Sequence, residues 1–196
     1  MNADVLLTDL KKRVTQKSSD PRFKHNAWFV TYHLEIVEAI AIELCDKYPS
    51  ADKNYILTLV WLHDFEKIID FDNQYNTELI ASKELMKEVG YDQGFIDRMY
   101  DDLNMYNAKN NLHLAPIEIQ IVSSADAASH FIGPFAELYW YENPDKSIQQ
   151  LQSDNIKKLT TDWDLKITLP EVKEASYDRY LSKRASAGIL PDKYLD

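Results

Sequence analysis

Residues 56–67 read Ile-Leu-Thr-Leu-Val-Trp-Leu-His-Asp-Phe-Glu-Lys, an apolar run that ends in ionisable side chains. Spacings of three and four residues place Ile56, Val60 and His63 on one face of an α-helix. We expect this helix to extend from about residue 51 to 69. Its buried face then contains a histidine among aliphatic side chains, which is the first indication of a functional site.

The rest of the chain shows the same helical periodicity and contains only four glycines. The pattern predicts an all-α fold, a single-domain bundle of about seven to nine helices that spans residues 1–196. Besides the helix at 51–69, we expect helices at about residues 2–18, 27–47, 77–89, 92–105, 116–132, 145–161 and 170–187. We expect Asn76 to cap the helix at 77–89 and Gly90 to end it.

Charge is distributed unevenly along the chain. The formal net charge is -10, and residues 25–144 carry 20 acidic against seven basic side chains. Such a field repels a phosphate backbone, so we expect no broad nucleic-acid binding. A small phosphorylated ligand is compatible with the acidity, because a bound metal ion reverses the local potential.

Cys45 is the only cysteine, which excludes an intramolecular disulfide and favours a reducing compartment. We interpret it as a small buried filler. The N-terminal residues contain early acids and no signal-peptide core, and no run approaches membrane-spanning length. The expected location is cytoplasmic, without membrane association.

Two further ionisable side chains lie on apolar helix faces. His33 shares a face with Val37, and Asp126 shares one with Val122. Burying such groups without partners costs several kcal/mol, and a shared cation would remove that cost. Two imidazoles and two carboxylates form a mixed set that suits one divalent Mn, Fe, Co, Ni or Zn ion.

The order His33, His63-Asp64, Asp126 resembles the HD-domain superfamily of metal-dependent phosphohydrolases. The run 60–67 looks like that family's apolar approach to His-Asp with a following lysine, and Ser123-Ser124-Ala125-Asp126 is similar to its last motif. The resemblance covers roughly residues 25–135 and leaves 140–196 as a helical extension. It implies a helical fold of that type, in which His33, His63, Asp64 and Asp126 bind the metal.

Asp64 and Lys67 are the candidate catalytic residues. The resemblance implies that Asp64 holds or accepts a proton of the attacking water. Lys67 follows His63 by one helical turn, so its ammonium can contact a phosphate over the site; pairing with Asp70 is the competing interpretation. Glu66 could also act as a general base, but we rank it below Asp64 because its side chain should point away from that carboxylate.

Two other histidines are candidate substrate contacts. His113 either lines the pocket or caps a helix. Some members of the HD-domain superfamily bind a second metal through extra histidines between the His-Asp pair and the last Asp; because His113 is the only histidine in that interval here, the resemblance implies a one-metal site. His130, four residues after Asp126, either orients that carboxylate or simply continues the helix face. For His25 a structural or surface role is favoured.

These features predict a hydrolase that cleaves a phosphate mono- or diester of a nucleotide or other small metabolite with a metal-activated water. One alternative is a non-catalytic module of the same fold that binds a phosphorylated ligand or a partner protein. Another is a structural protein assembled through the aromatic segment 135–141, which otherwise reads as core or as a homodimer surface. The C-terminal basic residues read mainly as a solvated face, or else as contacts to a second phosphate: Lys157, Lys158, Lys166, Arg179 and Arg184.

Overall fold

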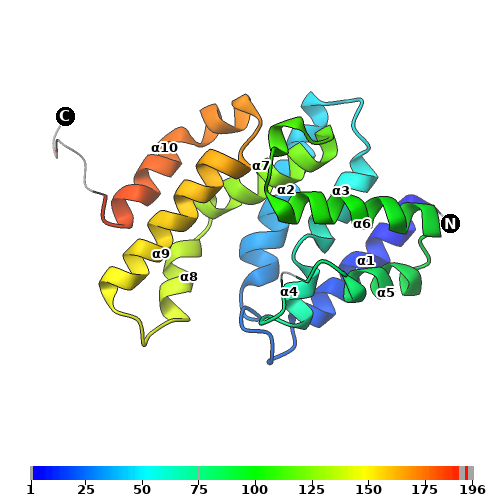
Figure 1. Cartoon of the computed structure of the whole chain (residues 1–196), viewed down its shortest axis with the longest axis horizontal. Coiled ribbons are helices and arrows are strands. Elements are labelled where there is room, and N and C mark those ends of the chain that lie inside the picture. Colours follow the sequence, from blue (N-terminus) through cyan, green and yellow to red (C-terminus); the bar gives the residue numbers. More distant parts are fainter. Residues whose placement is uncertain (1, 75, 190–192, 194–196) are drawn as a thin grey trace.

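Figure 1 shows the computed structural model of the chain, which describes residues 2–74, 76–189 and 193. Across these residues the fold is all-helical and has no strand, as the sequence predicts. The α-helices are α1 (Ala3–Ser18), α2 (Glu35–Lys47), α3 (Lys53–Leu62), α4 (Phe65–Ile69), α5 (Ile80–Val89), α6 (Gln93–Ala108), α7 (Ile117–Ile132), α8 (Phe135–Tyr141), α9 (Ile148–Thr161) and α10 (Pro170–Ser186). The π-helical segments are η1 (Val30–Leu34) and η3 (Asp162–Lys166), and a 3₁₀ turn is η2 (Leu112–Leu114).

Helix α7 lies at the centre of the bundle. It packs against α2, α3, α10 and η3, and Figure 1 shows it between the N-terminal helices and the α8–α10 group. Every side chain from Ile121 to Phe131 is buried, which the small residues Ser123 to Ala128 allow by letting neighbouring helices approach closely. Asp126 therefore lies inside the protein, between helices that are far apart in sequence.

The predicted helix at 51–69 is interrupted at His63 and Asp64, two of the candidate metal ligands. α3 ends at Leu62, and α4 begins at Phe65. Asp64 has φ -116° and ψ 15°, outside the helical region, and this breaks the hydrogen-bond ladder between the two helices. The prediction of one continuous helix is wrong, and the break lets His63 and Asp64 turn toward the same point.

The boundaries of α5 and α6 also differ from the predicted ones. α5 begins at Ile80 rather than 77, because Leu79 is left-handed (φ 48°) and the Asn76 side chain accepts a hydrogen bond from the Glu78 N–H in a preceding turn. Gly90 ends α5 with φ 101°, as predicted. α6 continues to Ala108, three residues beyond the predicted end and into the expected loop.

The C-terminal part also differs from the expected helix–joint–helix pattern. α9 continues into η3, so residues 162–164 are helical rather than a linker. This wider turn buries Asp162 and Lys166 against α7, where the Ser123 hydroxyl donates to the Lys166 carbonyl at 2.9 Å. Among the described helices, none combines the length and apolar character that crossing a membrane requires.

Candidate metal centre

His33 enters the site from η1, a widened turn that leads into α2. Its side chain is buried, and its Nδ1 lies 3.2 Å from the Ser129 hydroxyl oxygen. That hydroxyl donates its own hydrogen to the Asp126 carbonyl at 2.7 Å, so the His33 Nδ1–H is the donor between the two side chains. Burial lowers the pKa of His33 to about 4, so the ring is neutral at pH 7 and its Nε2 carries a free lone pair.

His63 faces His33 from the end of α3. Its Nδ1 donates to the Val60 carbonyl at 2.7 Å, which fixes the ring and directs Nε2 inward. The two Nε2 atoms lie 3.3 Å apart. When both rings are neutral, two lone pairs point at each other in a buried space, and a cation between them converts this repulsion into coordination.

Asp64 supplies a carboxylate from the break between α3 and α4. Its Oδ2 lies 3.6 Å from His33 Nε2 and 3.7 Å from His63 Nε2. Burial opposes its ionisation, but the positive charge of Lys67, 3.2 Å away, and the neighbouring imidazoles hold the pKa of Asp64 well below its usual range. The carboxylate is therefore charged at neutral pH.

Asp126 supplies the second carboxylate from α7, and its two oxygens have different partners. Oδ1 lies 3.6 Å from His33 Nε2 and 3.8 Å from His63 Nε2. Oδ2 accepts from the Tyr106 hydroxyl at 2.5 Å and forms a close ion pair with the Lys166 ammonium. Although burial opposes ionisation, Lys166 and the imidazoles hold the pKa of Asp126 well below its usual range.

Each of the two carboxylates, together with the two imidazoles, is spaced as the ligands of a divalent cation are. Ligand atoms about 2.1 Å from one ion lie roughly 3.0 Å apart at right angles and about 4.2 Å apart when opposite. The two imidazole nitrogens lie 3.3 Å apart, and each carboxylate oxygen lies 3.6 to 3.8 Å from both of them. His33, His63 and Asp64 form one compact set of metal-ligand type, and His33, Asp126 and His130 form another.

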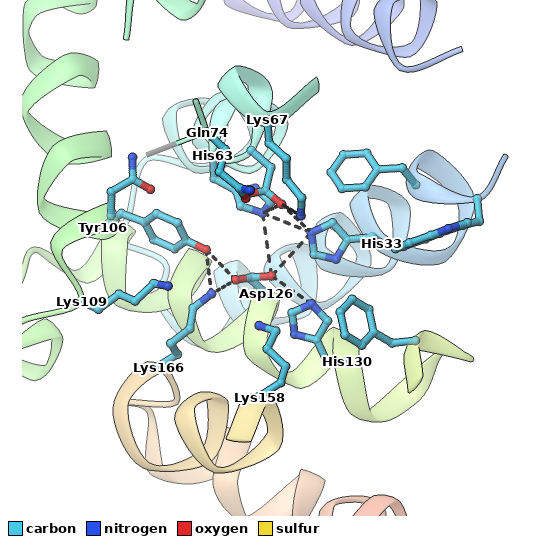
Figure 2. A pocket seen from close by; sticks show the side chains of 15 residues that line it. His33, His63, Lys67, Gln74, Tyr106, Lys109, Asp126, His130, Lys158 and Lys166 are labelled. Carbon is cyan, nitrogen blue, oxygen red and sulfur yellow. Dashed lines mark hydrogen bonds and ion pairs between the residues drawn. The ribbon is translucent and has the colours of Figure 1, made fainter. Parts of the chain in front are cut away.

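The site lies in a pocket of about 170 Å³ (Figure 2). Its wall contains the imidazoles and carboxylates on one side and basic side chains around them. The remaining lining residues are Trp28, Phe29, Lys67, Gln74, Tyr106, Asn107, Lys109, His130, Phe135, Lys158 and Lys166. The pocket thus combines a candidate metal centre with the cations that an anionic ligand requires.

His130 lies beside the centre. Its Nε2 is 3.8 Å from Asp126 Oδ1, too long for a hydrogen bond, and its ring stacks on His33. Its Nδ1 lies 3.0 Å from Asp162 Oδ2 in poor hydrogen-bond alignment, so the attraction is mainly electrostatic. Burial lowers the pKa of His130, which favours a neutral ring beside the candidate metal centre.

Of the other candidate residues from the sequence, some lie at the pocket and others lie away from it. Lys67 lines the pocket and pairs with Asp64 rather than Asp70. His113 is exposed on the 3₁₀ turn η2 and does not line this pocket, so neither its pocket role nor its capping role is retained. Glu66 accepts from the Ser82 N–H at 2.9 Å, which fixes the start of α5.

Sequence reasoning missed several residues of the pocket. Tyr106 follows the buried stripe of α6, where such a tyrosine reads as ordinary core. The sequence pattern places Lys158 and Lys166 mainly on a solvated face. In the structure both line the pocket, and the π-helical turn after α9 brings Lys166 inside. Phe135 lines the pocket although its segment was assigned to core or dimer surface.

Comparisons with family models, curated proteins and solved structures find no match to this chain. The assignment of a function therefore depends on the geometry and chemistry of the pocket.

Proposed function

We propose that the protein is a metal-dependent phosphohydrolase of the HD-domain type, which cleaves a phosphate ester of a small metabolite such as a nucleotide. The order of His33, His63-Asp64 and Asp126 along the chain supports this family. The proposal places one divalent transition metal ion, Mn, Fe, Co, Ni or Zn, between these four side chains.

One observation carries the proposal. The Nε2 atoms of His33 and His63 face each other at 3.3 Å, and a carboxylate oxygen from Asp64 and one from Asp126 lie within 3.8 Å of both. Each imidazole is held in this orientation by its Nδ1 hydrogen bond. Acceptor atoms that converge in a buried space favour a bound cation. The lysines beside them favour an anionic ligand at that cation.

A divalent ion held by these four residues would supply a water of lowered pKa and would polarise a phosphoryl oxygen. Asp64 is the more accessible carboxylate, with 27% of its side chain exposed against 4% for Asp126, so we assign it to hold the attacking water. The ammonium of Lys67 lies beside Asp64 and would stabilise charge on the phosphoryl oxygens. These are the roles of Asp64 and Lys67 that the sequence predicted.

The proposal also covers the substrate and the binding partners of the protein. The acidic composition favours a small phosphorylated substrate over a nucleic-acid chain. Trp28 and Phe135 at the pocket provide an apolar wall for its organic part. A reducing, cytoplasmic location, inferred from Cys45, and a homodimer through exposed residues of α8 such as Tyr141 belong to the same proposal.

The test begins with protein purified without chelators. Elemental analysis should find one divalent transition metal ion per chain. A screen of phosphorylated metabolites with added Mn²⁺, Co²⁺ or Ni²⁺ should then detect release of inorganic phosphate or cleavage of a diester. The variant Asp64→Ala should lose at least about 100-fold in kcat, a loss typical of removing a central catalytic group, and should keep its helical circular dichroism.

Asp72→Ala is the matched control, because Asp72 is an exposed acid shortly after α4. It should retain wild-type turnover. Metal and tight ligand binding without any turnover would favour the non-catalytic module. Absence of bound metal under every condition, or full activity of Asp64→Ala, would contradict the assignment.

A further inference from the structure

Three lysines converge on the side of the pocket opposite Lys67 (Figure 2). Lys109 follows α6, Lys158 belongs to α9 and Lys166 ends η3, so three separate segments bring them together. Two of the three lie outside the part of the chain that resembles the HD-domain family. Their meeting is a property of the tertiary fold rather than of the metal-site motif.

The three ammonium groups repel one another. Burial, together with the positive charges of Lys166 and Lys158, lowers the pKa of Lys109. Lys166 is balanced by Asp126, and Lys158 lies 2.7 Å from Asp162 Oδ1. Four lysines and two carboxylates line the pocket and Asp162 lies behind its wall, so several ammonium groups are gathered around one small space. A divalent cation would increase this positive charge further.

The volume of the pocket limits what can enter it. About 170 Å³ is below the roughly 300 Å³ at which pockets begin to enclose a whole drug-sized ligand. A phosphate group can lie inside, while an organic substituent must leave through the mouth. Trp28 and Phe135 in the pocket lining meet edge to face, with ring centroids 6.1 Å apart, and offer such a substituent an apolar surface.

We propose, on the basis of the function proposed above, that this pocket takes a phosphomonoester dianion, with Lys158 and Lys109 contacting the phosphoryl oxygens opposite the His-Asp centre. A monoester has three non-bridging oxygens and two negative charges for groups on both sides of the pocket. A diester has two such oxygens, one charge and a second organic substituent. The lysines gathered at the pocket and its small volume both select the monoester.

The reaction is balanced by one water molecule. The water oxygen forms a bond to phosphorus while the bond from phosphorus to the ester oxygen breaks. The leaving oxygen gains a proton that originates from the water, so the products are an alcohol and inorganic phosphate. Inorganic phosphate should therefore bind to the same lysines as the substrate.

The direct test is calorimetric titration of the Mn²⁺-loaded full-length protein with inorganic phosphate. Lys158→Gln should weaken phosphate binding by about tenfold or more, which corresponds to the loss of one charge-assisted contact. Lys157→Gln is the matched control, because Lys157 is the adjacent residue of α9 and is exposed. It should leave the Kd unchanged.

Lys109→Gln is the second variant, because Lys158→Gln also removes the partner of buried Asp162 and can disturb folding. Its effect on phosphate binding should be similar, with an unchanged helical spectrum. Wild-type phosphate affinity in a folded Lys109→Gln protein, or no phosphate binding by the Mn²⁺-loaded wild type, would overturn the assignment of this subsite.

A second arm compares 4-nitrophenyl phosphate with bis(4-nitrophenyl) phosphate under the same conditions. We expect a kcat/KM at least about tenfold higher for the monoester, because a second charge-assisted contact is available to it. A preference for the diester would overturn the inference while the phosphohydrolase proposal stands. Cleavage of neither ester, nor of any metabolite in the screen, would overturn the proposed function, whereas the phosphate titration would still decide whether the lysine subsite exists.

Discussion

The two oxygens of the Asp126 carboxylate have different surroundings: one faces the proposed metal position, and the other is held in place by neighbouring side chains. Oδ1 faces the imidazoles, whereas Oδ2 is held by the Tyr106 hydroxyl and the Lys166 ammonium. The Lys166 Nζ also donates to the Tyr106 oxygen at 2.9 Å, so the three groups form a closed buried network. Asp126 raises the pKa of Lys166 well above its usual range despite burial, which keeps the ammonium charged.

Tyr106→Phe should therefore weaken metal binding without unfolding the protein. The substitution removes one hydrogen bond that orients the carboxylate of Asp126, a proposed metal ligand. Loss of such a supporting contact typically costs about 10- to 100-fold in metal affinity. Titration of the metal-stripped protein with Mn²⁺ measures the effect.

Tyr55→Phe provides a matched control for this prediction. Tyr55 is also buried and donates to an aspartate, Asp102, at 2.5 Å, but neither residue lines the pocket. Its loss should lower stability and leave the Kd for Mn²⁺ unchanged. Equal Mn²⁺ affinities of the two variants would show that the Tyr106 hydroxyl has no positioning role.

The stability of the metal-free protein should decrease as the pH falls from about 6.5 to 4. Burial, followed by the charge of Lys67, lowers the pKa of His25 to about 4, and burial lowers that of His33 to about 4. An unfolded histidine binds a proton near pH 6.5, so in this interval the unfolded state binds more protons than the folded state. Protonation therefore favours unfolding.

Urea unfolding of the chelator-treated protein at pH 7 and pH 5 measures this linkage. The free energy of unfolding should be smaller at pH 5. The double variant His25→Gln/His33→Gln should show a weaker pH dependence. A free energy that rises on acidification through this interval would contradict the assignment of neutral buried imidazoles.

The site depends on two departures from regular helix. The π-helical turn η1 contains His33, and the break between α3 and α4 contains His63 and Asp64. On a continuous helix adjacent side chains point about 100° apart, so the pair would diverge. The sequence predicted which residues lie on buried faces, but not these local changes, because a period of 3.6 residues contains no signal for either.

A third local feature joins two segments of the pocket lining. The Glu142 carboxylate, at the C-terminal end of α8, accepts from Trp28 Nε1 at 2.6 Å and lies 2.7 Å from His25 Nδ1. It joins the segment before η1 to α8, and both segments line the pocket through Trp28 and Phe135. His25 is thus a structural residue, in agreement with the interpretation that the sequence favoured.

Glu142→Ala should lower the free energy of unfolding by about 1–3 kcal/mol, because it leaves the largely buried indole N–H of Trp28 without its acceptor. Glu137→Ala is the control on the same helix: Glu137 is 60% exposed, and its 3.4 Å contact with Lys183 should contribute less than about 1 kcal/mol. Urea unfolding measures both. Equal losses for the two variants would exclude a special role for the Glu142 contacts.

The pocket as a whole is assembled from both halves of the chain. The N-terminal part supplies the imidazoles and Asp64, α7 supplies Asp126, and the segment from α9 to η3 closes the basic side (Figure 2). The Ser124 hydroxyl accepts from the Thr168 N–H at 3.1 Å, which fixes the chain directly after η3 against α7. Lys166 therefore reaches Asp126 only when the C-terminal segment is folded in place.

This assembly explains the limit of prediction from the sequence. His33, His63 and Asp126 are identifiable because each interrupts an apolar helical stripe with an ionisable group. Lys158 and Lys166 give no such signal, since their position depends on contacts between distant segments. The exposed place of His113 has the same cause: the spacing along the chain does not say on which side of the 3₁₀ turn it lies.

Anomalous X-ray diffraction from crystals grown with Co²⁺ or Mn²⁺ tests the central claim most directly. The structure predicts one strong peak about 2.0–2.3 Å from His33 Nε2, His63 Nε2 and a carboxylate oxygen each of Asp64 and Asp126. No peak at this position in metal-saturated crystals, or a metal bound only by other residues, would contradict a shared divalent ion at the centre of the pocket.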